Sequence, residues 1–123
     1  MEVPLISVVD DDHSVRESLA RLIRSVGFGV QLFGSAEEFL SAGQVREPDC
    51  LILDIRMPGM NGLELQRELS VSERDLPVIF ITAHGSDEGV RARAMGAGAV
   101  DYLLKPLKEE EVLKAIDVAL SLN

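Results

Sequence analysis

Residues 50–69 read CLILDIRMPGMNGLELQREL, and this stretch contains the structural unit that decides the fold. The short apolar run at 50–53 is typical of a strand. A turn-rich loop follows at 57–62, where proline restricts one backbone dihedral and the glycines relax others. Leu65 and Leu69 are four residues apart, which indicates a helix. The stretch therefore predicts one strand, one loop and one helix in succession.

The same unit recurs on both sides of this stretch. Apolar runs rich in β-branched residues predict further strands at 5–9, 30–33, 78–81 and 100–104. Between them, apolar residues recur with helical spacing, as at 15–26 and 112–120. Ser35, with Glu38 three residues later, predicts a helix that begins with a capping box. Alternating strands and helices imply right-handed crossovers, so the predicted fold class is α/β, a doubly wound five-stranded parallel sheet with the pattern (βα)5.

One predicted helix differs from the others. The segment 87–97 has a thin apolar stripe formed by Val90, Ala94 and Ala97 alone. Because burial of an apolar face supplies most of the stability of a helix in a protein, we expect this helix to be the least firmly packed.

Length and charge restrict the function. The chain has 123 residues, 46% of them hydrophobic, and a formal net charge of -9. Without a repeat or linker, we expect residues 1–123 to form a single domain. An acidic field repels polyanions, which argues against direct binding to nucleic acid or anionic membrane and favours a protein partner or a cation. No run approaches the roughly 20 apolar residues of a membrane span and no signal segment opens the chain, so we expect a cytoplasmic location.

Polar residues that could bind an ion or take part in a reaction follow several predicted strands. The first strand ends in Asp10-Asp11-Asp12, the third in Asp54 and the fourth in Thr82, and Lys105 follows the fifth. Ligands of an open parallel sheet bind beyond the carboxyl ends of its strands, so we expect five of these six groups to converge there.

The convergence favours phosphoryl transfer to an aspartate. Neighbouring carboxylates repel, and a hard divalent cation with oxygen ligands, most plausibly Mg²⁺, would offset that repulsion. A lysine and a hydroxyl complement the charge of a phosphoryl group, while a carboxylate can act as the nucleophile that forms an acyl phosphate.

Each element taken alone has an ordinary structural interpretation. The aspartate triplet can cap a helix, and Lys105-Pro106 can close a turn. His13 and His84 suit surface positions better than metal ligation, because no second histidine lies at ligand spacing. Cys50 is the only cysteine, lies in an apolar run and is expected to be a buried hydrophobic residue.

Taken together, four motifs resemble the receiver domain of two-component response regulators across essentially the whole chain. They are Val8 to Asp12, Leu51 to Gly62, Phe80 to His84, and Gly96 to Tyr102 leading to Lys105-Pro106. The stretch 33–40 resembles the subgroup that often precedes a LuxR-type helix-turn-helix output domain, and we expect no such domain within residues 1–123. Leu107 stands where that subgroup commonly has phenylalanine, and the helix start at 86–89 is polar. Because of these two departures, the resemblance does not define the dimer or partner surface.

The resemblance implies a flavodoxin-like sheet with strand order 2-1-3-4-5 and a role for each site residue. By resemblance Asp54 is the phosphoacceptor. Asp11 and Asp54 ligate Mg²⁺ with the backbone carbonyl of Arg56, and Asp10 assists through metal-bound water. Asp12 matches a more variable position and is left out of the site.

The resemblance also implies a switch and a partner. By resemblance, the Thr82 hydroxyl turns toward the phosphoryl group, and Lys105 forms an ion pair with that group. The rotamer of Tyr102 then changes in response to Thr82. A sensor histidine kinase donates the phosphoryl group, and the surface around residues 87–121 meets a second copy or a separate output protein. The Lys105-Pro106 peptide bond is expected to be cis.

Two alternatives come from other classes. A haloacid-dehalogenase-like phosphatase also uses a nucleophilic aspartate and Mg²⁺, but it needs a second aspartate two residues later, where this chain has Arg56. A docking module that has lost phosphorylation is the other alternative. The resemblance itself implies no enzyme in the usual sense: the domain assists its own phosphorylation and dephosphorylation, with no independent substrate turnover.

Overall fold

The structure, a computed structural model, describes residues 2–43, 46–83 and 88–122. These residues contain a five-stranded parallel sheet in the order β2-β1-β3-β4-β5, as the resemblance implied. The strands are β1 (Leu5–Val9), β2 (Gly29–Phe33), β3 (Cys50–Asp54), β4 (Val78–Thr82) and β5 (Asp101–Leu104). The helices are α1 (His13–Ser25), α2 (Ala36–Ser41), α3 (Gly62–Val71), α4 (Glu88–Gly96) and α5 (Glu109–Ser121).

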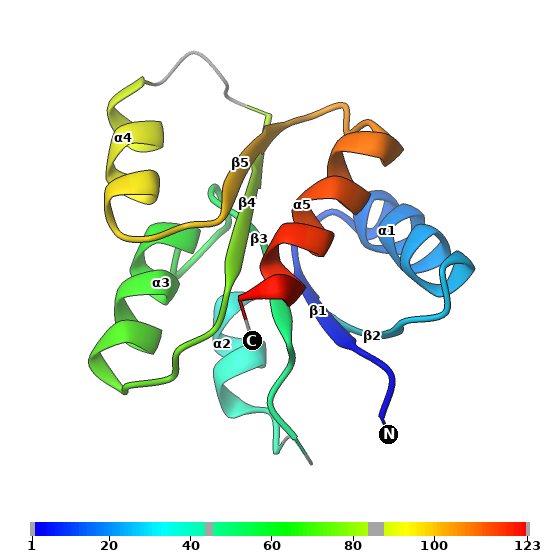
Figure 1. Cartoon of the computed structure of the whole chain (residues 1–123). Coiled ribbons are helices and arrows are strands. Elements are labelled where there is room, and N and C mark those ends of the chain that lie inside the picture. Colours follow the sequence, from blue (N-terminus) through cyan, green and yellow to red (C-terminus); the bar gives the residue numbers. More distant parts are fainter. Residues whose placement is uncertain (1, 44–45, 84–87, 123) are drawn as a thin grey trace.

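Different helices cover the two faces of the sheet. Helices α1 and α5 pack on one face, and α2, α3 and α4 pack on the other (Figure 1). Successive residues of a strand point to opposite faces, so the central strand β3 contributes to both cores. Leu51 and Leu53 contact the α2–α4 side, while Cys50 and Ile52 contact the α1–α5 side. Cys50 is buried, as expected.

The strand boundaries differ from the prediction by a single residue. Strands β3 and β4 each extend one residue further, because Asp54 pairs with Ile81 and Thr82 pairs with Leu104 in the sheet. Strand β2 begins at Gly29, and β5 begins at Asp101. The carboxylate of Asp54 and the hydroxyl of Thr82 are therefore carried by strand residues rather than by loop residues.

The predicted capping box at α2 is half formed. The Ser35 hydroxyl accepts a hydrogen bond from Glu38 N (3.0 Å), as expected. The Glu38 carboxylate accepts from Gly34 N (3.1 Å), one residue before the N-cap. A complete capping box occurs instead at α3, between Asn61 and Glu64.

Helix α4 is thinly packed, but not by all the predicted residues. Ala94 is its one buried residue, and Val90 packs against the core as a partly buried side chain. Ala97 was expected in the stripe, and this was wrong: the helix ends at Gly96, and Ala97 is exposed. Gly98, with a φ of +98°, redirects the chain toward β5. His84 and Asp87 lie outside the described residues.

None of the described helices combines the length and apolar character needed to cross a bilayer.

Candidate functional site

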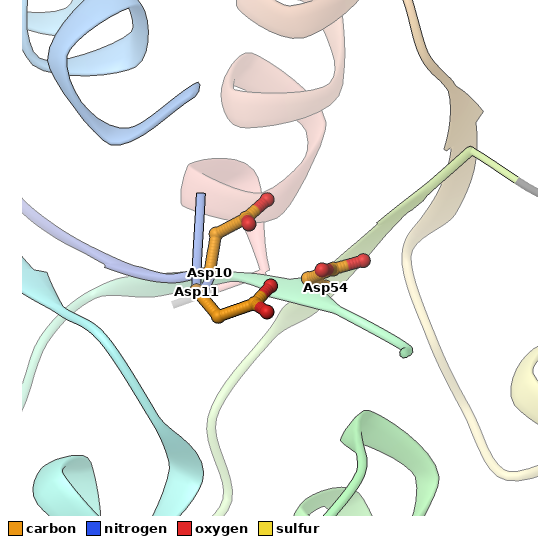
Figure 2. Close-up of side chains that lie close together, drawn as sticks. All are labelled: Asp10, Asp11 and Asp54. Atoms are coloured by element: carbon orange, nitrogen blue, oxygen red, sulfur yellow. The ribbon is translucent and has the colours of Figure 1, made fainter. Parts of the chain in front are cut away.

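Three carboxylates gather at the carboxyl edge of the sheet. Asp10, Asp11 and Asp54 each offer an oxygen, and these oxygens lie within 4.8 Å of one another. Figure 2 shows the three side chains together, Asp10 and Asp11 from the segment after β1 and Asp54 from β3. Strands β1 and β3 are paired neighbours, with Val9 opposite Leu53, which brings the residues that follow them together.

The cluster is buried on one side and open on the other. Asp10 is 0% and Asp54 4% exposed, whereas Asp11 is exposed to solvent. A donor set of oxygens alone, open to water on one side, fits a hard divalent cation that keeps part of its hydration shell. The residues that sequence reasoning placed at a metal site are therefore adjacent in space.

The three consecutive aspartates have different roles in the structure. Asp12 is the N-cap of α1, and its carboxylate accepts hydrogen bonds from Ser14 N (2.8 Å) and Val15 N (3.4 Å). Asp10 Oδ1 accepts from Asp12 N (2.8 Å), which turns the chain at the end of β1. Arg16 Nη1 donates to the Asp10 carbonyl (2.7 Å) and holds this turn from α1. Leaving Asp12 out of the predicted site agrees with its use as a helix cap.

Lys105 is the cation of the site. Its Nζ lies 2.9 Å from Asp10 Oδ2 and 3.6 Å from Asp54 Oδ2, and its side chain is 18% exposed. The backbone N–H of Lys105 donates to the carbonyl of Thr82 (2.8 Å), so the ends of β4 and β5 stay together. The Lys105-Pro106 peptide bond is cis, as the resemblance implied.

The electrostatics of the site favour a proton on Asp54 when only the protein's own groups are present. Burial and then the charge of Asp10 raise the pKa of Asp54 to about 7, with a smaller contribution from Asp11. Lys105 and a backbone hydrogen bond from Arg56 act in the opposite direction. Burial lowers the pKa of Lys105, but its hydrogen bond to Asp10 and the charge of Asp54 outweigh this, so the pKa of Lys105 is raised. Lys105 therefore stays charged.

Thr82 lies on β4 and Tyr102 on β5, and these two strands are paired neighbours in the sheet. Thr82 is buried at the end of β4, and side chains two apart in a strand share a face, so it faces the same side as Phe80. Tyr102 pairs with Phe80 in the sheet and packs in the α2–α4 core at 4% exposure. The guanidinium carbon of Arg91 lies 5.5 Å from the Tyr102 ring centre. Tyr102 is therefore a buried residue of the core on the α4 side of the sheet.

The loop after Asp54 depends on close contacts that the sequence patterns did not indicate. A Cβ added at Gly62 would lie 2.9 Å from Ile55 Cα and would collide with the Asp54 carbonyl, so this position accepts only glycine without a backbone shift. The Glu37 carboxylate of α2 accepts a hydrogen bond from Met60 N (2.8 Å). An exposed glutamate in the first turn of a helix ordinarily complements the helix dipole, and no sequence pattern indicates a contact 23 residues away.

Comparisons with known proteins agree on one family. Residues 6–117 match the family described as response regulator receiver domain. The response regulator protein TodT of Pseudomonas putida is 47% identical over 118 residues, which cover 96% of this chain and 52% of TodT. The solved structure of response regulator StyR superposes with a TM-score of 0.90 at 49% identity, covering 98% of this chain and 61% of that one. The structure of FixJ-N gives a TM-score of 0.85 at 41% identity, covering 98% and 96%.

The lengths of these proteins differ. The chain spans about half the length of relatives such as TodT and nodulation protein W of Bradyrhizobium diazoefficiens. The similarity therefore applies to one part of those proteins.

Proposed function

The chain belongs to the response regulator receiver domain family, and on this premise we propose that Asp54 is the carboxylate that receives the phosphoryl group. The chain is a signalling module with the phosphoacceptor function of two-component systems. One observation carries the assignment: Asp54 is a buried acid at the end of β3, grouped with Asp10 and Asp11 and 3.6 Å from Lys105. The phosphatase and docking-module alternatives have no support from the comparisons.

The acidic cluster is assigned to Mg²⁺. Receiver domains bind Mg²⁺ at an acidic pocket, and the oxygens of Asp10, Asp11 and Asp54 make such a pocket here. Asp11 and Asp54 would bind the ion directly together with the carbonyl of Arg56, and Asp10 would act through water. When bound, the ion supplies positive charge that offsets the carboxylates and the charge of the transferred group.

The residues of the chain have distinct roles in the transfer. An oxygen of the ionised Asp54 attacks the phosphorus of the donor, the new O–P bond forms as the donor's bond to phosphorus breaks, and the donor leaves with that electron pair. Lys105 lowers the pKa of Asp54 and so favours the ionised nucleophile. Its ammonium and the Thr82 hydroxyl would then bind phosphoryl oxygens through charge-assisted hydrogen bonds. Tyr102 shares the face of Thr82 and would respond to its movement.

The donor and the recipient of the signal follow from the family. Response regulators receive phosphoryl groups from histidine kinases, and we assign a sensor histidine kinase as the donor. The surface around residues 87–121 would meet a second copy of the chain or a separate output protein in the cytoplasm. The net charge of -9 disfavours direct contact of this domain with nucleic acid. We assign the chain to a single receiver domain that turns over no substrate of its own.

The proposal predicts that Mg²⁺ and acetyl phosphate add one phosphoryl group to the chain, seen by intact-mass spectrometry. Asp54→Asn should abolish the addition, because the amide is a poor nucleophile. Asp12→Asn is the matched control, since Asp12 caps α1 and lies outside the cluster. An equal mass gain in Asp54→Asn contradicts the assignment.

A further inference from the structure

The loop between β3 and α3 carries Arg56, whose carbonyl is assigned to the metal. Both ends of this loop are held by neighbouring residues. Gly62 N donates to the Ile55 carbonyl (2.9 Å), which closes the loop at its base. Asn61 and Glu64 exchange two hydrogen bonds of 2.9 Å in the capping box of α3. These contacts lie within the loop and the first turn of α3.

Glu37 of α2 contacts the loop near its α3 end. Its Oε2 accepts a hydrogen bond of 2.8 Å from Met60 N. The adjacent Gly59 has a φ of +76°, and a Cβ there would lie 2.6 Å from Glu37 Oε2 and 3.3 Å from Glu37 Cδ. The left-handed backbone at Gly59 favours glycine. Glu37 Oε2 lies where a Cβ would stand, so a larger residue at position 59 would displace the carboxylate from this contact.

Helix α2 is anchored well enough to act as a support. Ala36 and Phe39 are buried in the core cluster that also contains Met57 of the loop. Ser35 caps the helix through Glu38 N (3.0 Å). Hydrogen bonding from the Met60 backbone lowers the pKa of Glu37, which keeps the carboxylate ionised and its hydrogen bond charge-assisted. The support and the loop thus share one packed core.

The backbone of Arg56 links the loop to the phosphoacceptor. A hydrogen bond from the Arg56 backbone reaches the Asp54 side chain. A displaced loop would move this N–H as well as the carbonyl of the same residue.

We infer that Glu37 is a positioning residue of the phosphorylation site: it holds the 55–61 loop from α2 and so sets where the Arg56 carbonyl stands relative to Asp54. The inference rests on the proposed function, because it requires Arg56 to be a ligand of Mg²⁺. Glu37 itself is exposed and touches neither the acidic cluster nor a transferred group.

The test measures Mg²⁺ affinity directly, without phosphorylation. Titration of the ¹⁵N-labelled chain with MgCl₂ is followed through the amide shifts of Asp10, Asp11 and Asp54. Glu37→Ala should weaken Mg²⁺ binding about three- to tenfold, less than the loss typical when a group bonded directly to a metal ligand is removed, because Glu37 acts through the loop backbone. Glu37→Gln should stay close to wild type, since its amide oxygen can accept the same hydrogen bond.

Glu38→Ala is the matched control. It removes an equal charge from the same helical turn and one backbone hydrogen bond, but that bond goes to Gly34 rather than to the loop. Its Mg²⁺ affinity should equal that of wild type. Equal Mg²⁺ affinities in Glu37→Ala and Glu38→Ala overturn the inference. A Glu37→Gln variant that binds Mg²⁺ as weakly as Glu37→Ala also overturns it, because that result would indicate an effect of charge alone. A wild-type chain whose Asp10, Asp11 and Asp54 amides ignore Mg²⁺ would instead contradict the proposed function.

Discussion

Individual side chains set the balance of charge at the site. Asp10 and Asp54 are buried together. Among the described residues, Lys105 is the one whose charged group lies within 4.0 Å of both carboxylates. Asp12, adjacent in sequence, contributes its carboxylate to the start of α1 instead. Burial and the charge of Asp10 outweigh the attraction of the single lysine, so the pKa of Asp54 is raised to about 7. Ionising Asp54 therefore costs folding free energy, which a bound cation can relieve.

At this scale we predict that Asp54→Asn stabilises the metal-free chain in a pH-dependent way. The folded pKa of Asp54 lies above its ordinary value of 3.8, so the stability linked to its proton is fully present below pH 3.8 and is lost as the pH rises through about 7. Asparagine has no such dependence. The advantage of the variant should grow with pH toward at most about 4 kcal/mol.

Urea unfolding in EDTA at pH 5 and pH 8 measures this difference. Asp117→Asn, an exposed change on α5, is the control and should show no such trend. Saturating Mg²⁺ should reduce the advantage of Asp54→Asn, because the ion stabilises the wild-type carboxylate. A difference that is the same at both pH values would contradict the raised pKa.

Among the structural elements, the connection from β3 to α3 and helix α4 differ most in packing. The β3–α3 connection brings Gly62 against the backbone of Asp54 and Ile55. Helix α4 buries Ala94 alone, and a buried side chain of α3, Gln66, donates to the Ala94 carbonyl at 3.4 Å. The tight connection keeps the phosphoacceptor in place, and few apolar contacts resist a shift of α4.

For the tight connection, we predict that Gly62→Ala destabilises the chain by about 1–3 kcal/mol, because the added methyl meets backbone atoms that cannot rotate away. Thermal or urea unfolding measures the loss. Gly96→Ala in α4 is the control, since a Cβ there has open space and alanine favours the helix. Equal stability of the Gly62→Ala chain and wild type would show that the close approach is not restrictive.

On the scale of the whole molecule, the site lies where the ends of β1, β3, β4 and β5 meet. Thr82 and Tyr102 share the sheet face that α4 covers, and Arg91 of α4 lies over the Tyr102 ring. A phosphoryl group that attracts the Thr82 hydroxyl would therefore act on the side of the molecule where packing is thinnest. A small difference in free energy can then separate two positions of α4.

We predict that a phosphoryl mimic such as beryllium fluoride with Mg²⁺ changes the amide chemical shifts of residues 88–102 as well as those beside Asp54. The proposed reason is that movement of Thr82 toward the phosphoryl group would open space beneath α4 into which Tyr102 would rotate. Asp54→Asn should show no response and serves as the control. Shift changes confined to residues that contact Asp54 would refute the switch.

Much of the fold was predictable because its determinants are local. Apolar runs such as 50–53 and helical spacing such as 112–120 reflect contacts with one neighbouring layer, so the alternation of strands and helices follows from sequence. Boundaries moved by one residue where pairing with the next strand extended the ladder, as at Asp54 and Thr82. The strand order came from the family resemblance, since periodicity does not specify which strands are neighbours.

The sequence alone also placed Asp10, Asp11, Asp54 and Lys105 at one edge, because residues that follow parallel strands end on the same side of the sheet. Only the tertiary structure raised the pKa of Asp54 and brought Glu37 to Met60. These features depend on how deeply a side chain is buried and on how α2 packs beside a loop 23 residues away. Burial and long-range hydrogen bonds come into being when the layers assemble, so no local pattern encodes them.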